Sequence, residues 1–186
     1  MFDLADIPEK EAAVYPKHAY CLFCRTGREK DIASVIRITN ECEALIPRIE
    51  KEECRSGVWE RKVKSMLPGY LFIYSDSEFD FDRIKGIDGV LKILRYKDYE
   101  RDLRGDDRRF ADWLYSNGGT FGVSKAIKEG TKIRIVDGPL VQYAGSILEV
   151  KRQKRQAKVE ITVGSIRREI WMSFEWLEPE EIEGEK

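Results

Sequence analysis

Residues 130–163 read GTKIRIVDGPLVQYAGSILEVKRQKRQAKVEITV, and this stretch decides the fold of the C-terminal part of the chain. Short runs that alternate apolar and polar residues are separated by turns, the first of them DGP at 137–139. The next segment, EIWMSFEWLE at 169–178, alternates in the same way. Short strands at near-even spacing are typical of a small barrel, so we expect a β-barrel over residues 130–178.

Upstream of this barrel the chain mixes helix and strand patterns. AYCLFCR at 19–25 and PGYLFIYS at 68–75 are apolar runs rich in strand-favouring residues. Apolar residues at helical spacing begin near Arg28, and a second helical pattern runs from about Asp106 to the Asn-Gly-Gly break at 117–119. This combination predicts an α+β sandwich of helices and an antiparallel sheet.

The segment GGTFGVSKAIKE at 118–129 has glycines at its start and middle and little periodicity, which is typical of a flexible linker between small domains. We therefore expect an N-terminal extension at 1–18, an α+β domain at 19–117, the linker at 118–129, the barrel at 130–178 and an acidic tail at 179–186.

Composition limits the function classes. The 186 residues include 33 basic and 34 acidic ones, so any affinity for a polyanion must come from the distribution of charge. No apolar run approaches the ~20 residues that span a bilayer, and the first residues carry acids where a signal peptide is basic and then apolar, so we expect a cytoplasmic protein. The only histidine is His18, and no nucleophile with a base can be recognised, so we expect neither an enzyme nor a cofactor.

Cys21 and Cys24 form a C-x-x-C pair that could indicate zinc or redox chemistry, and Cys42 and Cys54 complete the set. The pair lies in a predicted strand, where residues three apart point to opposite faces of the sheet and cannot share a tetrahedral metal. We expect buried free thiols and no metal site.

Two stretches resemble a known family. YCLFCRTGRE at 20–29, KSMLPGYLFI at 64–73 and GVLKIL at 89–94 resemble, in order and spacing, the NGN domain of the NusG family of transcription elongation factors. The stretch at 130–163, with Gly145 at a bend, resembles a KOW motif. The resemblance implies an NGN domain that binds the β′ clamp helices of RNA polymerase beside the DNA cleft, and a KOW barrel, similar to a Src-homology-3 domain, that recruits a second partner.

By position, the resemblance implies polymerase binding by Phe23, Leu67, Tyr70 and Phe72, and contact with the exposed non-template DNA strand by Arg25 and Arg28. Tyr70 and Phe72 share one face of their strand, and aromatic side chains supply much of the energy of an interface. The alternative is that the four apolar residues are core, because buried and interface aromatics follow the same pattern. The two arginines could likewise be merely solvated.

Departures from the family pattern indicate which members of the NusG family the chain resembles least. Asp80-Phe81-Asp82 stands where one specialised relative reads DNA with His-Thr-Thr, and carboxylates would repel a phosphate backbone. Gly164-Ser165 stands where the housekeeping factor has a Phe-Gly pair that helps bind a ribosomal protein and the termination factor Rho. The aromatic anchor for those partners is missing.

The barrel also carries a basic stretch, because residues 151–168 contain seven cations and one acid, Glu160. The predicted RNA-binding residues are Lys151, Arg152, Lys154, Arg155, Lys158, Arg167 and Arg168, with Trp171 on the outward side of its strand and able to stack on a base. The alternative is a solvated turn. Specialised NusG relatives of the LoaP antiterminator type, which recognise a leader RNA hairpin, fit this pattern.

We therefore expect a monomeric elongation or antitermination factor that binds RNA polymerase through the NGN domain and an RNA hairpin through the KOW domain. One alternative is a housekeeping NusG-type factor that couples polymerase to the ribosome or Rho. The alternative from another class is a KOW-containing structural protein associated with the ribosome.

Overall fold

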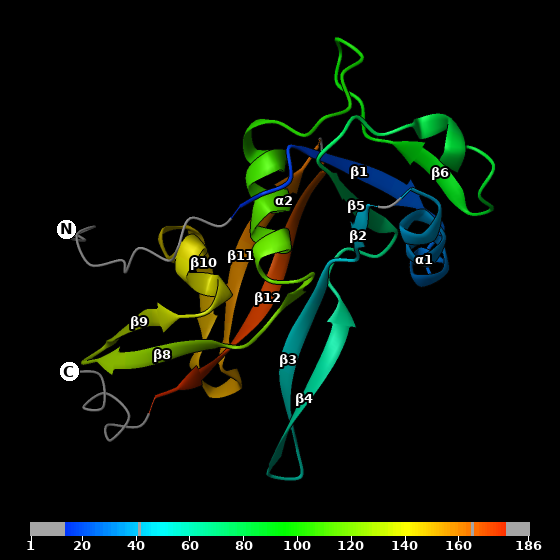
Figure 1. Ribbon diagram of the computed structural model, residues 1–186. Coiled ribbons are helices and arrows are strands. Elements are labelled where there is room, and N and C mark those ends of the chain that lie inside the picture. The colour runs from blue at the N-terminus through cyan, green and yellow to red at the C-terminus, as the bar shows by residue number, and fades with distance from the viewer. Residues whose placement is uncertain (1–13, 41, 165, 178–186) are drawn as a thin grey trace.

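The computed structural model describes residues 14–40, 42–164 and 166–177 (Figure 1). The acidic tail expected at 179–186 and most of the extension expected at 1–18 lie outside the described residues. Within the described part, no helix is both long and apolar enough to cross a lipid bilayer.

An antiparallel sheet with the order β2-β5-β1-β6 forms the centre of the N-terminal region. Its strands are β1 (His18–Cys24), β2 (Glu43–Leu45), β5 (Tyr70–Ser75) and β6 (Val90–Ile93). The helix α1 (Glu29–Asn40) packs Ile32 and Ile36 against one sheet face, where Leu22 and Leu71 are buried with them. The helix α2 (Gly105–Ser116) serves the opposite face, where Tyr74 donates a hydrogen bond to the carbonyl of Ala111 at 2.7 Å. The α+β prediction is confirmed for this region.

The expected helices have recognisable ends. Glu29 and Asp31 lie in the first turn of α1 and Arg37 in its last, which complements the helix dipole. A 3₁₀ turn, η1 (Phe81–Ile84), begins after Asp80, whose side chain accepts a hydrogen bond from the backbone of Asp82 at 3.0 Å. The helical segments predicted near Arg28 and Asp106 are thus confirmed.

A two-stranded hairpin of β3 (Arg48–Arg55) and β4 (Val58–Ser65) projects from this sheet (Figure 1). Its turn holds Ser56 and Gly57, both with positive φ, which suits a tight hairpin turn. The short strand β7 (Thr120–Phe121) pairs in parallel with β3 on the other side.

The C-terminal region is a five-stranded sheet with the order β10-β11-β12-β8-β9. Its elements are β8 (Ser124–Glu129), β9 (Lys132–Asp137), η2 (Pro139–Ser146), β10 (Ile147–Lys151), η3 (Arg152–Lys154), β11 (Gln156–Val163) and β12 (Ile166–Trp176). Val159 and Ile161 of β11 and Met172 and Phe174 of β12 are buried on one face, as their alternation predicts.

The prediction of a flexible linker at 118–129 is wrong, because these residues form the strands β7 and β8. Phe121 is fully buried and stacks on Trp113 at a ring-centroid distance of 3.6 Å. Gly119, two residues earlier, has a φ of 81° and makes the tight turn after α2. The glycines therefore serve turns, and the apolar residues between them anchor the segment in the core.

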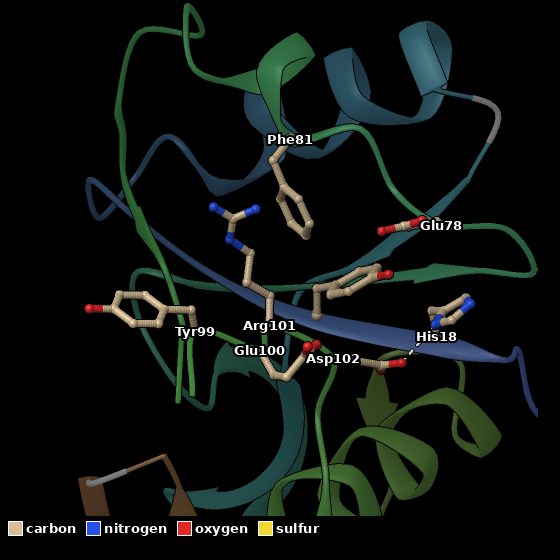
Figure 2. A pocket seen from close by; sticks show the side chains of 8 residues that line it. His18, Glu78, Phe81, Tyr99, Glu100, Arg101 and Asp102 are labelled. Carbon is tan, nitrogen blue, oxygen red and sulfur yellow. Dashed lines mark hydrogen bonds and ion pairs between the residues drawn. The ribbon is translucent and has the colours of Figure 1, made fainter. Parts of the chain in front are cut away.

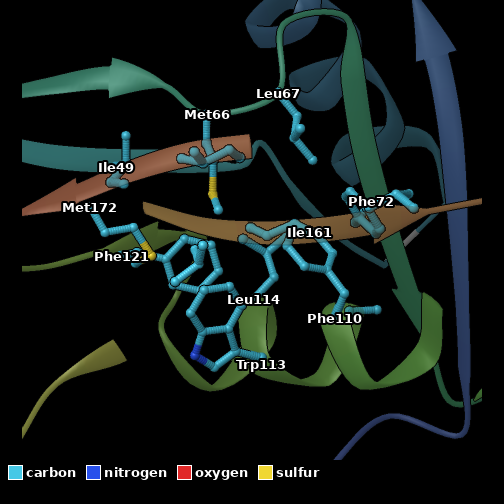
Figure 3. Close-up of a cluster of buried hydrophobic side chains, with 14 of the residues drawn as sticks. Ile49, Met66, Leu67, Phe72, Phe110, Trp113, Leu114, Phe121, Ile161 and Met172 are labelled. Atoms are coloured by element: carbon cyan, nitrogen blue, oxygen red, sulfur yellow. The ribbon is translucent and has the colours of Figure 1, made fainter. Parts of the chain in front are cut away.

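One hydrophobic core joins the two regions (Figure 3). Phe72, Phe110 and Leu114 of the N-terminal region belong to the same buried cluster as Ile161 and Met172 of the C-terminal region. The sequence predicted two separate domains joined by a flexible linker. Alternation shows which face of a strand is buried, but it does not show which distant segment covers that face, so the shared core could not be predicted.

Candidate functional site

The four apolar residues assigned to polymerase binding lie together in the shared core. Leu67, Tyr70 and Phe72 are 3%, 6% and 0% exposed, and Phe23 is half-buried against them. Phe23 lies opposite Tyr70 in the strand register, with their ring centroids 4.7 Å apart. In this arrangement the four residues belong to the hydrophobic core. The sequence left this open as the alternative to an exposed polymerase-binding surface.

The cover over this aromatic cluster comes from both regions. Phe110 of α2 packs on Phe72 at a centroid distance of 5.4 Å, and Ile161 of β11 lies beside both in Figure 3. Arg168 of β12 is close enough for its charge to act on the hydroxyl of Tyr70. The hairpin of β11 and β12 therefore completes the burial that α2 begins.

The tip of the β11–β12 hairpin is fixed to the N-terminal region through Asp107. This carboxylate, 7% exposed in the first turn of α2, accepts hydrogen bonds from the backbone N–H of Gly164 at 2.6 Å and the hydroxyl of Tyr96 at 2.7 Å. Gly164 has a φ of 61°, and a Cβ there would lie 2.9 Å from the side chain of Leu94. Sequence analysis missed Asp107 because an acid in the first turn of a helix is ordinary.

A second set of polar contacts fixes the other end of these strands to β3 and β4. The backbone N–H of Glu52 donates to the hydroxyl of Ser173 at 3.1 Å, and Arg61 forms ion pairs with Glu52 and Glu175. The guanidinium of Arg155 lies over the ring of Trp59, 4.4 Å from its centroid, and 4.0 Å from the carboxylate of Glu52. Polar contacts thus hold the hairpin at both ends, with the apolar cluster between them.

Two polar atoms in this interface are buried without a hydrogen-bond partner among the described residues: Tyr70 Oη and Glu52 Oε2. Burial raises the pKa of Tyr70, Cys21 raises it further, and Arg168 lowers it. An unsatisfied buried group costs about 1–3 kcal/mol, so the covered arrangement is less favourable than its apolar contacts alone suggest.

The comparisons with known proteins bear on this region. Residues 17–106 match the family model of NusG, described as a transcription termination factor. This part of the chain is therefore similar to the NusG family of transcription factors. The chain is 27% identical over 134 residues to the transcription termination/antitermination protein NusG of Thermus thermophilus, covering 65% of this chain and 71% of that protein.

The NusG-like fold extends beyond the matched residues. A solved structure reported as "Domain interaction in Thermotoga maritima NusG" covers 84% of this chain and 93% of its own, with a TM-score of 0.51 and 14% identity. At this identity the likeness concerns the fold alone.

The cations predicted to bind RNA lie in separate places, outside the matched NusG region. The ammonium groups of Lys151 and Lys158 lie 4.1 Å and 5.1 Å from the ring centroid of Trp171, which is half-buried. Lys158 is also 3.1 Å from a carboxylate oxygen of Glu149 and of Glu169, and these two hydrogen bonds raise its pKa. Both acids lie just outside residues 151–168, the stretch in which Glu160 is the single acid.

The remaining cations point in different directions. Arg152 and Lys154 are exposed in the η3 turn, where Arg152 donates to the carbonyl of Thr131. Arg167 pairs with Glu160 at 3.4 Å. Arg168 pairs in register with buried Ile161, so it lies on the opposite face of the sheet from Arg167. The expected single patch is therefore divided by strand alternation, with Arg155 and Arg168 directed toward the N-terminal region.

Within the region that matches the NusG family model, the two arginines assigned to DNA differ. Arg28 is paired with Asp31 at 3.2 Å and with Asp88 at 3.1 Å, whereas Arg25 is exposed. Asp80 and Asp82 form ion pairs with neighbouring basic side chains, at 3.4 Å and 2.5 Å. Arg25 is thus the more available of the two for a phosphate.

Cys21 and Cys24 are buried as predicted, whereas Cys42 is half-buried and Cys54 is exposed, so the expectation of buried thiols is wrong for Cys54. Cys21 lies in the core cluster of α2, and Cys24 lies in the cluster of α1 on the other sheet face. Burial raises the pKa of Cys24 to about 11 and that of Cys21 still higher. Among the residues with described positions, no three His, Cys, Asp or Glu side chains are grouped as a metal site.

Proposed function

We propose that this NusG-like transcription factor binds the β′ clamp helices of RNA polymerase through Phe23, Leu67, Tyr70 and Phe72. The match of residues 17–106 to the NusG family model supports a role in transcription, and the relative from Thermus thermophilus is itself named a termination/antitermination protein. The observation that carries the proposal is the aromatic cluster on β1 and β5, completed by the chain's own C-terminal hairpin and containing an unpartnered tyrosine hydroxyl. A polar handle on a buried aromatic is typical of interface tyrosines.

Polymerase binding through this cluster requires β11 and β12 to move away from it. Opening exposes apolar surface, but it also hydrates Tyr70 Oη, which recovers about 1–3 kcal/mol. Asp107 opposes opening, because its carboxylate would lose the hydrogen bond to Gly164. The partner must supply enough differential affinity for the open form to shift this equilibrium.

The second part of the proposal is that the C-terminal region binds a leader RNA hairpin and that the outcome is antitermination. Trp171 with Lys151 and Lys158 offers a ring for base stacking between two cations, and Arg152 and Lys154 extend the positive surface at the adjacent turn. Glu149 and Glu169 reduce the net charge, so RNA affinity should come from shape and stacking as well as charge. We propose Arg25 as the contact to non-template DNA.

The test compares two adjacent carboxylates in α2. Asp107→Asn weakens the hydrogen bonds to Gly164 and Tyr96, whereas Asp106→Asn changes an exposed acid whose only ion pair among the described residues is with Arg109. Hydrogen bonds to charged groups contribute about 1.5–3 kcal/mol, so Asp107→Asn should raise the affinity of the full chain for a β′ clamp-helix fragment by about tenfold or more. Asp106→Asn should leave this affinity unchanged.

Calorimetric titration of the fragment into each folded variant, checked by circular dichroism, measures the effect. Absence of fragment binding by every form of the chain would remove the polymerase proposal. Equal binding by Asp107→Asn and the unchanged protein would show instead that the hairpin does not limit access.

A further inference from the structure

Two turns of the C-terminal sheet meet and carry positive charge together. The turn between β8 and β9 is flanked by Lys128 and Lys132, and the η3 turn holds Arg152 and Lys154. The guanidinium of Arg152 donates a hydrogen bond to the carbonyl of Thr131, which joins the two turns. All four cationic side chains are exposed, and we call them the two-turn cluster.

The charge of this cluster is not neutralised by the described part of the chain, where none of its four cations forms an ion pair with a carboxylate. Glu129, next to the β8–β9 turn, is paired with Arg134 at 2.6 Å. Arg152 donates to a neutral carbonyl, which leaves its charge in place. By contrast, Lys158 on the outer face of β11 lies 3.1 Å from each of two acids. A polyanion therefore meets uncompensated charge at the two-turn cluster, and each phosphate bound there releases counterions.

The hollow beside β1 in the N-terminal region has the opposite charge. It measures about 360 Å³ and is lined by the carboxylates of Glu78, Glu100 and Asp102 (Figure 2). His18 Nδ1 lies 2.6 Å from Asp102 on its wall. A phosphate backbone is repelled by such a lining, so the cationic turns of the C-terminal sheet suit a nucleic acid better than this hollow does.

An aromatic ring lies beside the two-turn cluster. Trp176, the last residue of β12, is half-buried, and its ring packs edge-on against Phe174 at a centroid distance of 5.1 Å. The ammonium of Lys128 lies 4.9 Å from the centroid of the Trp176 ring. The backbone N–H of Leu177 donates to the carbonyl of Ala126 at 3.0 Å, which fixes the strand end that carries the ring. A fixed aromatic ring next to unpaired cations is the arrangement that binds unpaired bases together with their phosphates.

We propose that the two-turn cluster and Trp176 bind a single-stranded RNA segment that flanks the RNA hairpin. This site deepens the proposed RNA binding and rests on it for the class of partner. The new contacts are Lys128, Lys132 and Trp176, which lie outside the basic stretch at 151–168. The cations hold the phosphates and the ring stacks on a base, which requires an unpaired strand, because bases inside a double helix are not free to stack on a side chain.

Fluorescence anisotropy can measure binding of the full chain to a hairpin RNA, to the same hairpin with an unpaired extension of about eight nucleotides, and to that extension alone. We expect the extension to tighten hairpin binding about tenfold or more, the effect of stacking a single base. Lys128→Gln combined with Lys132→Gln should remove most of this gain and lower the salt slope for the extended hairpin by about 1.4, with the affinity for the plain hairpin unchanged. The matched control, Lys30→Gln combined with Lys97→Gln, changes two exposed lysines of the N-terminal region and should keep the gain.

The plain hairpin tests the proposed RNA binding separately. If it binds but the extension adds no affinity, or if the gain survives the substitution of Lys128 and Lys132, the single-strand site is refuted and the hairpin proposal stands. If the plain hairpin fails to bind while the extension alone binds through these lysines, the hairpin proposal falls and the single-strand site stands. Failure of both probes refutes both. Tighter binding of a DNA extension of the same sequence would overturn the assignment to RNA.

Discussion

Replacing Tyr70 by phenylalanine should stabilise the protein. The hydroxyl of Tyr70 is buried between the sheet and the β11–β12 hairpin without a hydrogen-bond partner among the described residues. Since burying such a group costs about 1–3 kcal/mol, its removal should raise the free energy of unfolding by about 1 kcal/mol. For a chain of this length, that corresponds to a rise of about 2–4 °C in the thermal midpoint. Tyr74→Phe is the matched control, because the hydroxyl of Tyr74 donates to the carbonyl of Ala111 at 2.7 Å.

The control should move in the opposite direction, with a loss of about 1 kcal/mol. Thermal unfolding followed by circular dichroism, together with urea titration, would measure both changes. Tyr70→Phe should also stabilise the covered arrangement over the open one, so its affinity for a clamp-helix fragment should fall about fivefold. If Tyr70→Phe lowers the midpoint as much as Tyr74→Phe does, the hydroxyl of Tyr70 is satisfied and the reasoning about this interface is refuted.

Three further outcomes follow from the structure. Lys151→Gln combined with Lys154→Gln should reduce the slope of log affinity against log salt by about 1.5 for a hairpin RNA, measured by filter binding, and an unchanged slope would mean that neither lysine contacts a phosphate. Gly138→Ala should destabilise the chain by about 2 kcal/mol or more in urea unfolding, because φ is +88° and a Cβ would lie 2.7 Å from a backbone carbon of β8; an unaltered midpoint would contradict this. At pH 8 a thiol reagent should modify exposed Cys54 first, with Cys24 protected by burial and a pKa raised to about 11, and equal rates would show that β1 opens readily.

The sequence predicted local structure well where one period dominates. Strand alternation gave the buried faces of β11 and β12, and helical spacing gave the buried residues of α2. The segment at 118–129 was misjudged because glycines that serve turns look the same in sequence as glycines that serve a linker. Phe121 was the informative residue there, since a linker has no reason to carry a fully buried aromatic.

Contacts between distant segments could not be predicted from periodicity. The hydrogen bond of Asp107 to Gly164 joins residues 57 positions apart, and that of Glu52 to Ser173 joins residues 121 positions apart. The basic stretch was overestimated for a related reason. A count along the chain ignores that Glu169 faces Lys158 across the strand pair and that Arg168 lies on the other face of the sheet.

Strands β11 and β12 serve both proposed interactions, and Arg155 connects them. The inner face supplies Ile161 and Met172 to the shared core, whereas Lys158 and Trp171 lie together on the outer face. Because side chains alternate, most residues of these strands contribute to one interaction only. Arg155 stands at the end of the basic turn, yet its guanidinium rests on a ring of the β3–β4 hairpin near Glu52. If RNA binds at this turn as proposed, its phosphates compete with Glu52 for the same guanidinium, and by linkage RNA binding and release of the covered aromatic cluster favour one another.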